Sequence, residues 1–278
     1  MLAGIALLFA FQGFSRADDN HEAKAITDCS KVIDRAGRYF LAKDLKMCQD
    51  FGVSITVSNV ELELRDHTIQ GPSNQGGLIN VGGNTGVSNI QIVGPGTLTG
   101  GSVGIFFQNV QCSQVNNLVV VGNTLGIVVT GTSGGGGNIC EAVVGPDDLR
   151  SVQTMTGTTS TDNEFRDNVV AGQIMDGVDV TVPHNRFIHN NLSGNGLSCN
   201  GLSANCGHGL FLFADNNIVS HNTVDSNRTI GIDVFGSGSI IDHNTALGNS
   251  IDLQDENNGI CTDNTWTDNS FNSPFGCN

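Results

Sequence analysis

Basic side chains are scarce in this sequence of 278 residues. It contains 12 Lys and Arg against 27 Asp and Glu, which gives a formal net charge of −15. No lysine follows Lys46. Proteins that bind nucleic acid neutralise phosphates with Lys and Arg, so this balance of charge argues against nucleic acid as a partner.

Long hydrophobic runs are also missing. The apolar run at residues 2–14 is too short to span a membrane, and Ser15 and Ala17 follow it as the small residues of a signal-peptide cleavage site. We expect residues 1–17 to be a signal peptide, weak or truncated because no basic residue precedes the run, and we expect no membrane insertion. Residues 18–278 would then form one domain. A buried N-terminal segment is the alternative.

None of the eight cysteines forms a CxxC pair, the usual spacing of a metal site. An even number of cysteines in an exported chain indicates disulfide bonds, which form outside the cytoplasm. We therefore expect a secreted or extracellular protein, with the periplasm and the cell surface as variants of this prediction. Pairing of neighbours, one of many arrangements, would join Cys29 to Cys48, Cys112 to Cys140, Cys199 to Cys206 and Cys261 to Cys277.

What the sequence has in excess is glycine, with 37 residues, and a repeat of about 22 residues. The repeat shows in asparagines at positions 168, 190, 222, 244 and 269, and in glycines before alternating apolar residues at 104, 126, 177, 209 and 231. Longer intervals predict loops at 131–162 and 194–207. No unit has helical periodicity, so each predicts a coil of three short strands that stacks on the next by parallel pairing. The asparagines would then form a hydrogen-bonded ladder.

The segments IDRAGRYFLAKDL, VSNVELELRDHTIQG and HNTALGNSIDLQDENNGICTDNTWTDNSF resemble the first and last coils of the right-handed parallel β-helix superfamily, the pectate-lyase-like fold, and in particular its secreted bacterial β-helix repeat proteins. The resemblance covers nearly the whole mature chain. It implies an all-β, single-stranded right-handed parallel β-helix solenoid of about nine coils. That superfamily includes polysaccharide lyases, galacturonan hydrolases, uronate epimerases, tailspike-like depolymerases and members without known activity, so the likeness specifies the fold rather than the chemistry.

The alternation of side chains along a strand predicts which residues face solvent. In strands of the GIDV type the second and fourth residues fill the coil and the third points outward. The outward positions, with SIDL aligned to GIDV, are Phe106, Val128, Asp179, Phe211, Asp233 and Asp252. Two residues further along, the same face carries Gln108, Thr130, Thr181, Phe213, Phe235 and Gln254.

The C-terminal half of this face combines carboxylates with phenylalanines. Flat rings suit the apolar faces of sugars, which makes Phe211, Phe213 and Phe235, together with Gln254, candidate substrate-binding residues. Contacts with another molecule and burial under the 194–207 insertion are the alternatives for these rings.

Paired carboxylates are a second signal on this face. Asp233 and Asp252 on adjacent rungs would lie about 5 Å apart, as in retaining glycosidases, whereas Asp179 and Asp233 would lie about 10 Å apart, at the wide edge of an inverting pair. One Asp of a close pair would stay protonated and act as the acid. Asp176 and His208, which directly precede the glycines of their strands, are further candidates for proton transfer or orientation.

Metal binding is the other chemistry to weigh. The carboxylates could instead bind Ca²⁺, the one cofactor that this sequence suggests, or form a solvated acidic row. His189, His221 and His243 precede the ladder asparagines on three consecutive coils and should stack. Because adjacent rungs give a row and not a tetrahedral cluster, we expect no metal there and imidazoles that satisfy polar groups of the turns.

Known catalytic signatures are missing. There is no P-loop, GxSxG or HExxH, and neither the NTD and RIK signatures of the galacturonan hydrolases nor the DPH signature of the mannuronan epimerases. Lyases of the superfamily that this chain resembles commonly use Lys or Arg to neutralise the uronate and to remove its proton. Because no lysine follows Lys46, a lyase mechanism of that kind is in doubt. We expect a carbohydrate-active protein that binds an extended polysaccharide along this strand face, and whether it also cleaves the polysaccharide, as a glycoside hydrolase or lyase, stays open at this point. A non-catalytic extracellular structural or adhesion solenoid is the alternative, and the oligomeric state is open.

Overall fold

The computed structural model describes residues 22–72, 76–131, 162–199, 206–256, 263–273 and 276–277. Every regular element in these ranges is a β-strand, and most strands are short. Within the same ranges no helix has the length and apolar character needed to cross a membrane. The expected signal peptide at residues 1–17 lies outside the described residues.

The strands form two long sheets and a shorter third face. The first long sheet contains, in spatial order, β1 (Lys24–Ile26), β3 (Gly37–Leu41), β5 (Val60–Glu63), β8 (Ile90–Val93), β11 (Gln114–Asn116), β14 (Glu164–Arg166), β17 (Arg186–Ile188), β19 (Ile218–Ser220), β21 (Ile240–Asp242) and β24 (Thr265–Thr267). The second contains β2 (Lys31–Ile33), β4 (Val53–Ile55), β7 (Gly77–Ser88), β10 (Val103–Gln111), β13 (Leu125–Thr130), β16 (Val178–Val180), β18 (Leu210–Leu212), β20 (Ile230–Val234), β23 (Ile251–Asp255) and β26 (Gly276–Cys277). The third face consists of β6 (Thr68–Gln70), β9 (Thr97–Thr99), β12 (Val119–Val121) and β15 (Val169–Ala171), followed by β22 (Thr245–Ala246) and β25 (Ser270–Phe271).

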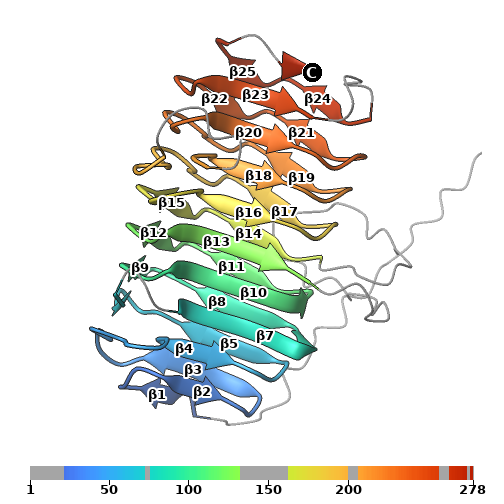
Figure 1. Ribbon diagram of the computed structural model, residues 1–278. Helices are drawn as coiled ribbons and strands as arrows, with labels where there is room; N and C mark the ends of the chain where they lie inside the picture. The colour runs from blue at the N-terminus through green and yellow to red at the C-terminus, as the bar shows by residue number, and fades with distance from the viewer. Residues whose placement is uncertain are drawn as a thin grey trace, which may run out of the picture.

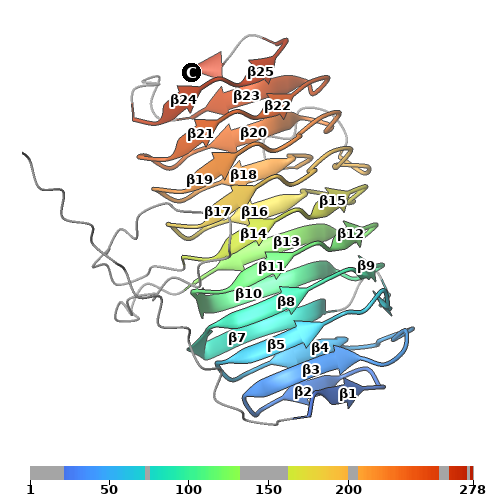
Figure 2. The ribbon, with the colours of Figure 1, turned by 180° about the vertical axis from the view of Figure 1, so that it is seen from behind.

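All pairings between the described strands are parallel. The chain therefore winds as a right-handed parallel β-helix, and its coils stack from β1 and β2 at one end to β24 and β25 at the other (Figure 1). The view from behind shows the same stacking (Figure 2). The predicted fold class is confirmed. The expected count of about nine coils is not, since each long sheet has ten strands.

Alternating apolar residues fill the interior, as the strand pattern predicts. Ile232 and Val234 of β20 are fully buried, and so are their counterparts in β16 and β18. Below the first long sheet, the ring centroids of Phe107 and Phe165 lie 5.5 Å apart, and those of Phe165 and Phe187 lie 5.0 Å apart. Each such ring contributes about 1.5–3 kcal/mol through burial.

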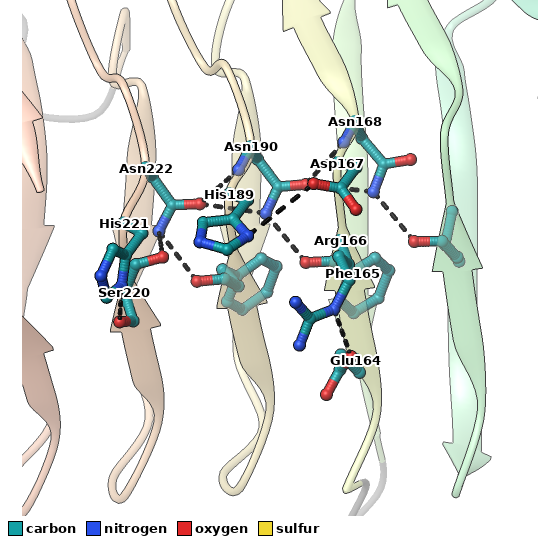
Figure 3. Close-up of polar contacts among 12 residues, drawn as sticks. Glu164, Phe165, Arg166, Asp167, Asn168, His189, Asn190, Ser220, His221 and Asn222 are labelled. Atoms are coloured by element: carbon teal, nitrogen blue, oxygen red, sulfur yellow. Dashed lines mark hydrogen bonds and ion pairs between the residues drawn. The ribbon is translucent and has the colours of Figure 1, made fainter. Parts of the chain in front are cut away.

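Asparagine ladders hold the turns between strands. In the predicted ladder, Oδ1 of Asn190 accepts hydrogen bonds from the backbone N and from Nδ2 of Asn168, and Asn222 does the same for Asn190 (Figure 3). Asn244 and Asn269 continue it, so this ladder is confirmed. Two more ladders were not foreseen, one through Asn123, Gln173, Asn195, Asn227 and Asn249, the other through Ser113, Asn163, Asn185, Asn217, Ser239 and Asn264. They satisfy buried polar groups in the coils from Ser113 and Asn123 toward the C-terminal end of the stack.

Two of the predicted disulfides are present, Cys29–Cys48 and Cys199–Cys206. Cys112 is also disulfide-bonded, but its predicted partner Cys140 lies outside the described residues. Cys261 of the fourth predicted pair lies outside them as well. Disulfides of this kind are typical of proteins that fold in an oxidising compartment.

Candidate functional site

The candidate site lies on the outer face of the second long sheet, where one column of residues runs through successive strands. Pairing places Phe106, Val128, Asp179, Phe211 and Asp233 level with one another, as the sequence predicts. The column continues on β23 with Gln254, which pairs with Asp233.

The predicted pairing of Asp233 with Asp252 is therefore wrong. In the observed register Leu253 lies level with Ile232, which places Asp252 beside Gly231. The similarity of SIDL to GIDV suggested an alignment that is two residues off. A Cβ at Gly231 would come within 2.5 Å of the Asp252 carbonyl oxygen, so the observed register leaves no room for a side chain at position 231.

Asp252 is a buried hydrogen-bond acceptor that ends one of the ladders. Its Oδ1 accepts from the backbone N and Nδ2 of Asn249, and its Oδ2 accepts from the backbone N of Asn272 and of Ser273, at 2.8–3.1 Å. Burial alone raises the pKa of Asp252, but the hydrogen bonds from Ser273, Asn272 and Asn249 outweigh it and hold the pKa below its ordinary value. An ionised carboxylate engaged in this way is not available to a substrate.

The other four predicted catalytic residues gather at one place on β16, β18 and β20 and the turns before them. Nδ1 of His208 lies 3.0 Å from Oδ1 of Asp176, which also accepts from the backbone N of His208 at 2.8 Å. On the other side, Nε2 of His208 lies 3.5 Å from Oδ2 of Asp233. Asp179 lies in the column with Asp233, separated from it by Phe211. We call Asp176, Asp179, His208 and Asp233 the carboxylate cluster.

Burial controls the protonation of this cluster. His208 and Asp233 are each only 1% exposed. Burial raises the pKa of Asp233 to about 7, although the charge of His208 opposes the shift. The pKa of Asp179 is also raised, by burial and by the negative charge of Asp176. A carboxyl group that keeps its proton near neutral pH can act as a general acid.

Several polar atoms in and beside the cluster have no hydrogen-bond partner in the described part of the chain. They are Oδ1 of Asp179, Nε2 of His208, Oδ1 of Asp233 and Oε1 of Gln254. Buried polar atoms are normally satisfied, so a concentration of exceptions marks a place for groups from outside the chain.

Three phenylalanines border the cluster. The ring of Phe211 stacks on His208 at 5.0 Å and contacts the rings of Phe235 at 5.3 Å and Phe213 at 6.3 Å. Phe213 and Phe235 are 5.7 Å apart, and Phe213 is 58% exposed. The predicted clustering of these three rings is confirmed, while their role in binding stays a prediction.

Gln254 does not lie where the sequence placed it. It was expected level with Phe235, but it is buried beside Asp233, and its Nε2 donates to Glu256. Glu256, one residue beyond the pair Val234–Asp255, is the residue that follows Phe235 in that column. Its negative charge contributes to the raised pKa of Asp233. Sequence analysis missed Glu256 because its place depends on the same two-residue shift.

The cluster is not a compact metal site. In the described ranges, the one group of three candidate ligands with atoms within 4.8 Å of one another is His221, Asp242 and His243. These residues follow the first long sheet, away from the carboxylate cluster. The expected Ca²⁺ at the carboxylates stays a prediction.

Neither a protein-family model nor a curated protein matches the sequence. Among solved structures, the chain is similar to pectate lyase Pel9A, with 12% identity, a TM-score of 0.54, and coverage of 92% of this chain and 69% of the lyase. The Dettilon tailspike protein follows with 13% identity, a TM-score of 0.46 and coverage of 91% and 50%. For the Azotobacter vinelandii mannuronan C-5 epimerase AlgE4 A-module these values are 12%, 0.41, 88% and 80%. The likeness to the lyase shows the fold, a right-handed parallel β-helix.

Proposed function

We propose that the protein is a secreted carbohydrate-active β-helix that binds an extended polysaccharide along the outer face of the second long sheet and hydrolyses it at the carboxylate cluster. One observation carries the proposal: a carboxyl group with a pKa of about 7, Asp233, lies beside three clustered phenylalanines. Glycoside hydrolysis needs a protonated acid and a second carboxylate, and aromatic rings beside them give sugar rings a surface to stack on.

Asp233 serves as the general acid in this scheme. It gives its proton to the glycosidic oxygen as the bond to the anomeric carbon breaks, while Asp179 takes a proton from the water that attacks that carbon. The two residues lie two rungs apart, about 10 Å at the backbone, which corresponds to the wider spacing of inverting enzymes. His208 is a positioning residue, held by Asp176 with Nε2 toward Asp233.

Hydrolysis suits this surface better than β-elimination. Elimination from a uronate needs positive charge near the sugar carboxylate, and the side chains around Asp233 include the acidic residues Asp176 and Glu256 instead. Phenylalanine rings and carboxylates fit a neutral polysaccharide, whose hydroxyl groups can satisfy the unpartnered atoms of Asp179 and Gln254.

The burial of Asp233 and His208 sets a condition on the reaction. The glycosidic oxygen reaches Asp233 only when side chains over the cluster move, and the ring of Phe211, stacked on His208, is the one in contact. The same burial favours the second candidate function, a non-catalytic extracellular solenoid, because a closed cluster is what a purely structural column would show.

The two functions are separated by incubating the mature protein with neutral and uronic polysaccharides, with and without Ca²⁺. Reducing ends report hydrolysis and unsaturated products report elimination. We expect reducing ends from a neutral polysaccharide, lowered about 100-fold or more in both Asp233→Asn and Asp179→Asn. Asp34→Asn, at an exposed position on an N-terminal coil, is the matched control. Activity that survives both cluster variants would rule out the proposed site. If no polysaccharide gives a product, the non-catalytic extracellular solenoid is the function that remains.

A further inference from the structure

A row of imidazoles lies at the turn that follows the first long sheet. His189, His221 and His243 come directly after β17, β19 and β21 and directly before asparagines of the first ladder. The ring centroids of His189 and His221 lie 5.1 Å apart. Those of His221 and His243 lie 4.8 Å apart with nearly parallel planes. Figure 3 shows the first two rings on neighbouring coils beside Asn190 and Asn222.

The backbone explains part of this pattern. The three histidines have φ between 54° and 57°, in the left-handed region, and Asp167 and Asp268 occupy the same turn position with φ of 56° and 53°. Asn, Asp and His are the side chains that tolerate this region best after Gly. The turn thus restricts the residue type, but it does not require imidazole on three coils in succession.

The sequence predicts that these imidazoles satisfy polar groups of the turns, and two of them contact side chains that directly precede the turn. Nδ1 of His221 lies 2.7 Å from the Ser220 hydroxyl, and Nδ1 of His243 lies 3.0 Å from Oδ2 of Asp242. Ser220 and Asp242 are themselves paired across β19 and β21. His221 and His243 therefore lie beside Ser220 and Asp242, whose side chains carry oxygen atoms. All four residues lie where β19 and β21 end.

Three of these side chains come close enough to share one ion. A ring nitrogen of His221, a ring nitrogen of His243 and a carboxylate oxygen of Asp242 lie within 4.8 Å of one another. Nδ1 of His243 and Oδ2 of Asp242 lie 3.0 Å apart, somewhat closer than the roughly 3.3–3.6 Å between ligand atoms of a tetrahedral shell with bonds of about 2.0–2.2 Å. His221 is exposed and the side chain of His243 is 48% exposed, so a small rotation of either ring meets little resistance.

We propose that His221, Asp242 and His243 bind one divalent transition-metal ion, with Zn²⁺, Ni²⁺ and Cu²⁺ as the class that two imidazoles and a carboxylate select. Water completes the coordination shell of the ion. The protein therefore does not have to supply all four ligands, which a row of imidazoles could not do. Because the ligands come from adjacent coils, the ion ties β19 to β21. The site is independent of the proposed hydrolysis on the other sheet.

Titration of the full-length protein with ZnCl₂, NiCl₂ and CuCl₂ by calorimetry tests the proposal. We expect one saturable site per chain, tightest for Cu²⁺ by the usual order of divalent metals, and a rise in the thermal midpoint when it fills. His221→Asn and His243→Asn should each weaken binding about tenfold or more. Asn is chosen because it tolerates the positive φ of this turn.

His67→Asn is the matched control, because Nδ1 of His67 lies 3.3 Å from Asp44 in a single His–Asp pair on another coil. It should bind the ion as the parent does. As a readout that needs no variant, Ni²⁺ or Cu²⁺ should broaden the imidazole proton resonances of His221 and His243 before those of His67. Absence of saturable binding at millimolar metal, binding by both row variants as tight as that of the parent, or broadening that spares His221 and His243 would overturn the proposal.

Discussion

The imidazole of His208 lies between carboxylates of the coils on either side: its Nε2 lies 3.5 Å from Oδ2 of Asp233, and its Nδ1 lies 3.0 Å from Oδ1 of Asp176. Asp176 and Asp233, 57 positions apart in sequence (233 − 176), thus contact the same side chain. Only the stacking of coils brings them together, and the charge of His208 opposes the rise in pKa that burial gives Asp233.

The pH dependence of hydrolysis is the first consequence. A general acid must hold its proton, so activity should fall as pH rises through the pKa of Asp233, about 7. The charge of His208 lowers that pKa, and His208→Gln removes it. We expect the basic limb of the kcat/KM profile near pH 7 in the parent and at higher pH in the variant. A limb that does not move would show that His208 does not act on the acid.

Stability should depend on the same group, with a sign that can be worked out. The folded pKa of Asp233 is raised from 3.8 to about 7, so the folded state binds more protons than the unfolded state between these values. The free energy of unfolding therefore falls as pH rises from about 4 to 7, by up to roughly 4 kcal/mol. Asp233→Asn should be more stable than the parent at pH 8 and similar to it at pH 4, as measured by urea unfolding. Parallel pH curves for the two proteins would contradict this.

Two periodic features of the sequence, the 22-residue repeat and the alternation of apolar residues, determine how much of the structure it predicts. A 22-residue repeat with alternating apolar residues is enough to predict the coil, the first asparagine ladder and the column from Phe106 to Asp233. Register fails at β23, where Ile251 and Leu253 fit the coil interior in either of two alignments. A shift of two residues keeps every apolar side chain inside, so hydrophobic pattern cannot detect it. The observed register brings the Asp252 carbonyl oxygen within 2.5 Å of where a Cβ of residue 231 would lie, a close approach that Gly231 permits and that the sequence pattern does not reveal.

Close contacts inside the cluster were also beyond the sequence. Asp176 and His208 could be placed on successive coils by counting, but the 3.0 Å contact between them depends on how the chain bends before Gly177 and Gly209. The same bend brings His208 onto Phe211. The second and third ladders were missed because Gln173, Ser113 and Ser239 interrupt the run of asparagines that a repeat search detects.

Asp252 should behave oppositely to Asp233. Its folded pKa is lowered, so its contribution to stability is present above its ordinary pKa of 3.8 and is lost as pH falls through the lower folded value. Asp252→Asn replaces one accepting oxygen by a donor that faces backbone N–H groups of Asn272 and Ser273. We expect a loss of about 3 kcal/mol at pH 7, shrinking below pH 4. Equal stability at pH 7 would show that the carboxylate does not hold the last coil.

Exposed aromatic area should control binding of the polysaccharide. Phe213 is 58% exposed and contacts both other rings of the platform, so Phe213→Ala removes a stacking surface with little change in the core. We expect about tenfold weaker binding, corresponding to roughly 1.4 kcal/mol, with an unchanged melting temperature. Phe271→Ala is the control, because Phe271 is 42% exposed but lies on β25 of the third face. Equal loss in both variants would show that the platform is not the binding surface.

The last prediction concerns the contribution of the first asparagine ladder to the free energy of unfolding. Oδ1 of Asn222 accepts from the backbone N and Nδ2 of Asn190, and its Nδ2 donates to the carbonyl of Phe187 and to Oδ1 of Asn244. Asn222→Ala removes the acceptor of the Asn190 backbone N and the side-chain donor to the Phe187 carbonyl, both buried in the middle of the stack. Each unsatisfied group costs about 1–3 kcal/mol, so we expect a loss of roughly 4 kcal/mol in the free energy of unfolding.

Asn272→Ala is the control for this ladder variant, because Asn272 is exposed and donates to Oδ2 of Asp252 through its backbone N, which alanine keeps. We expect it to unfold as the parent does. If Asn222→Ala unfolds as the parent does too, the ladder would be a consequence of the stacking and not a cause of it. The apolar interior, with Phe165 stacked on Phe187, would then set the register of the coils by itself.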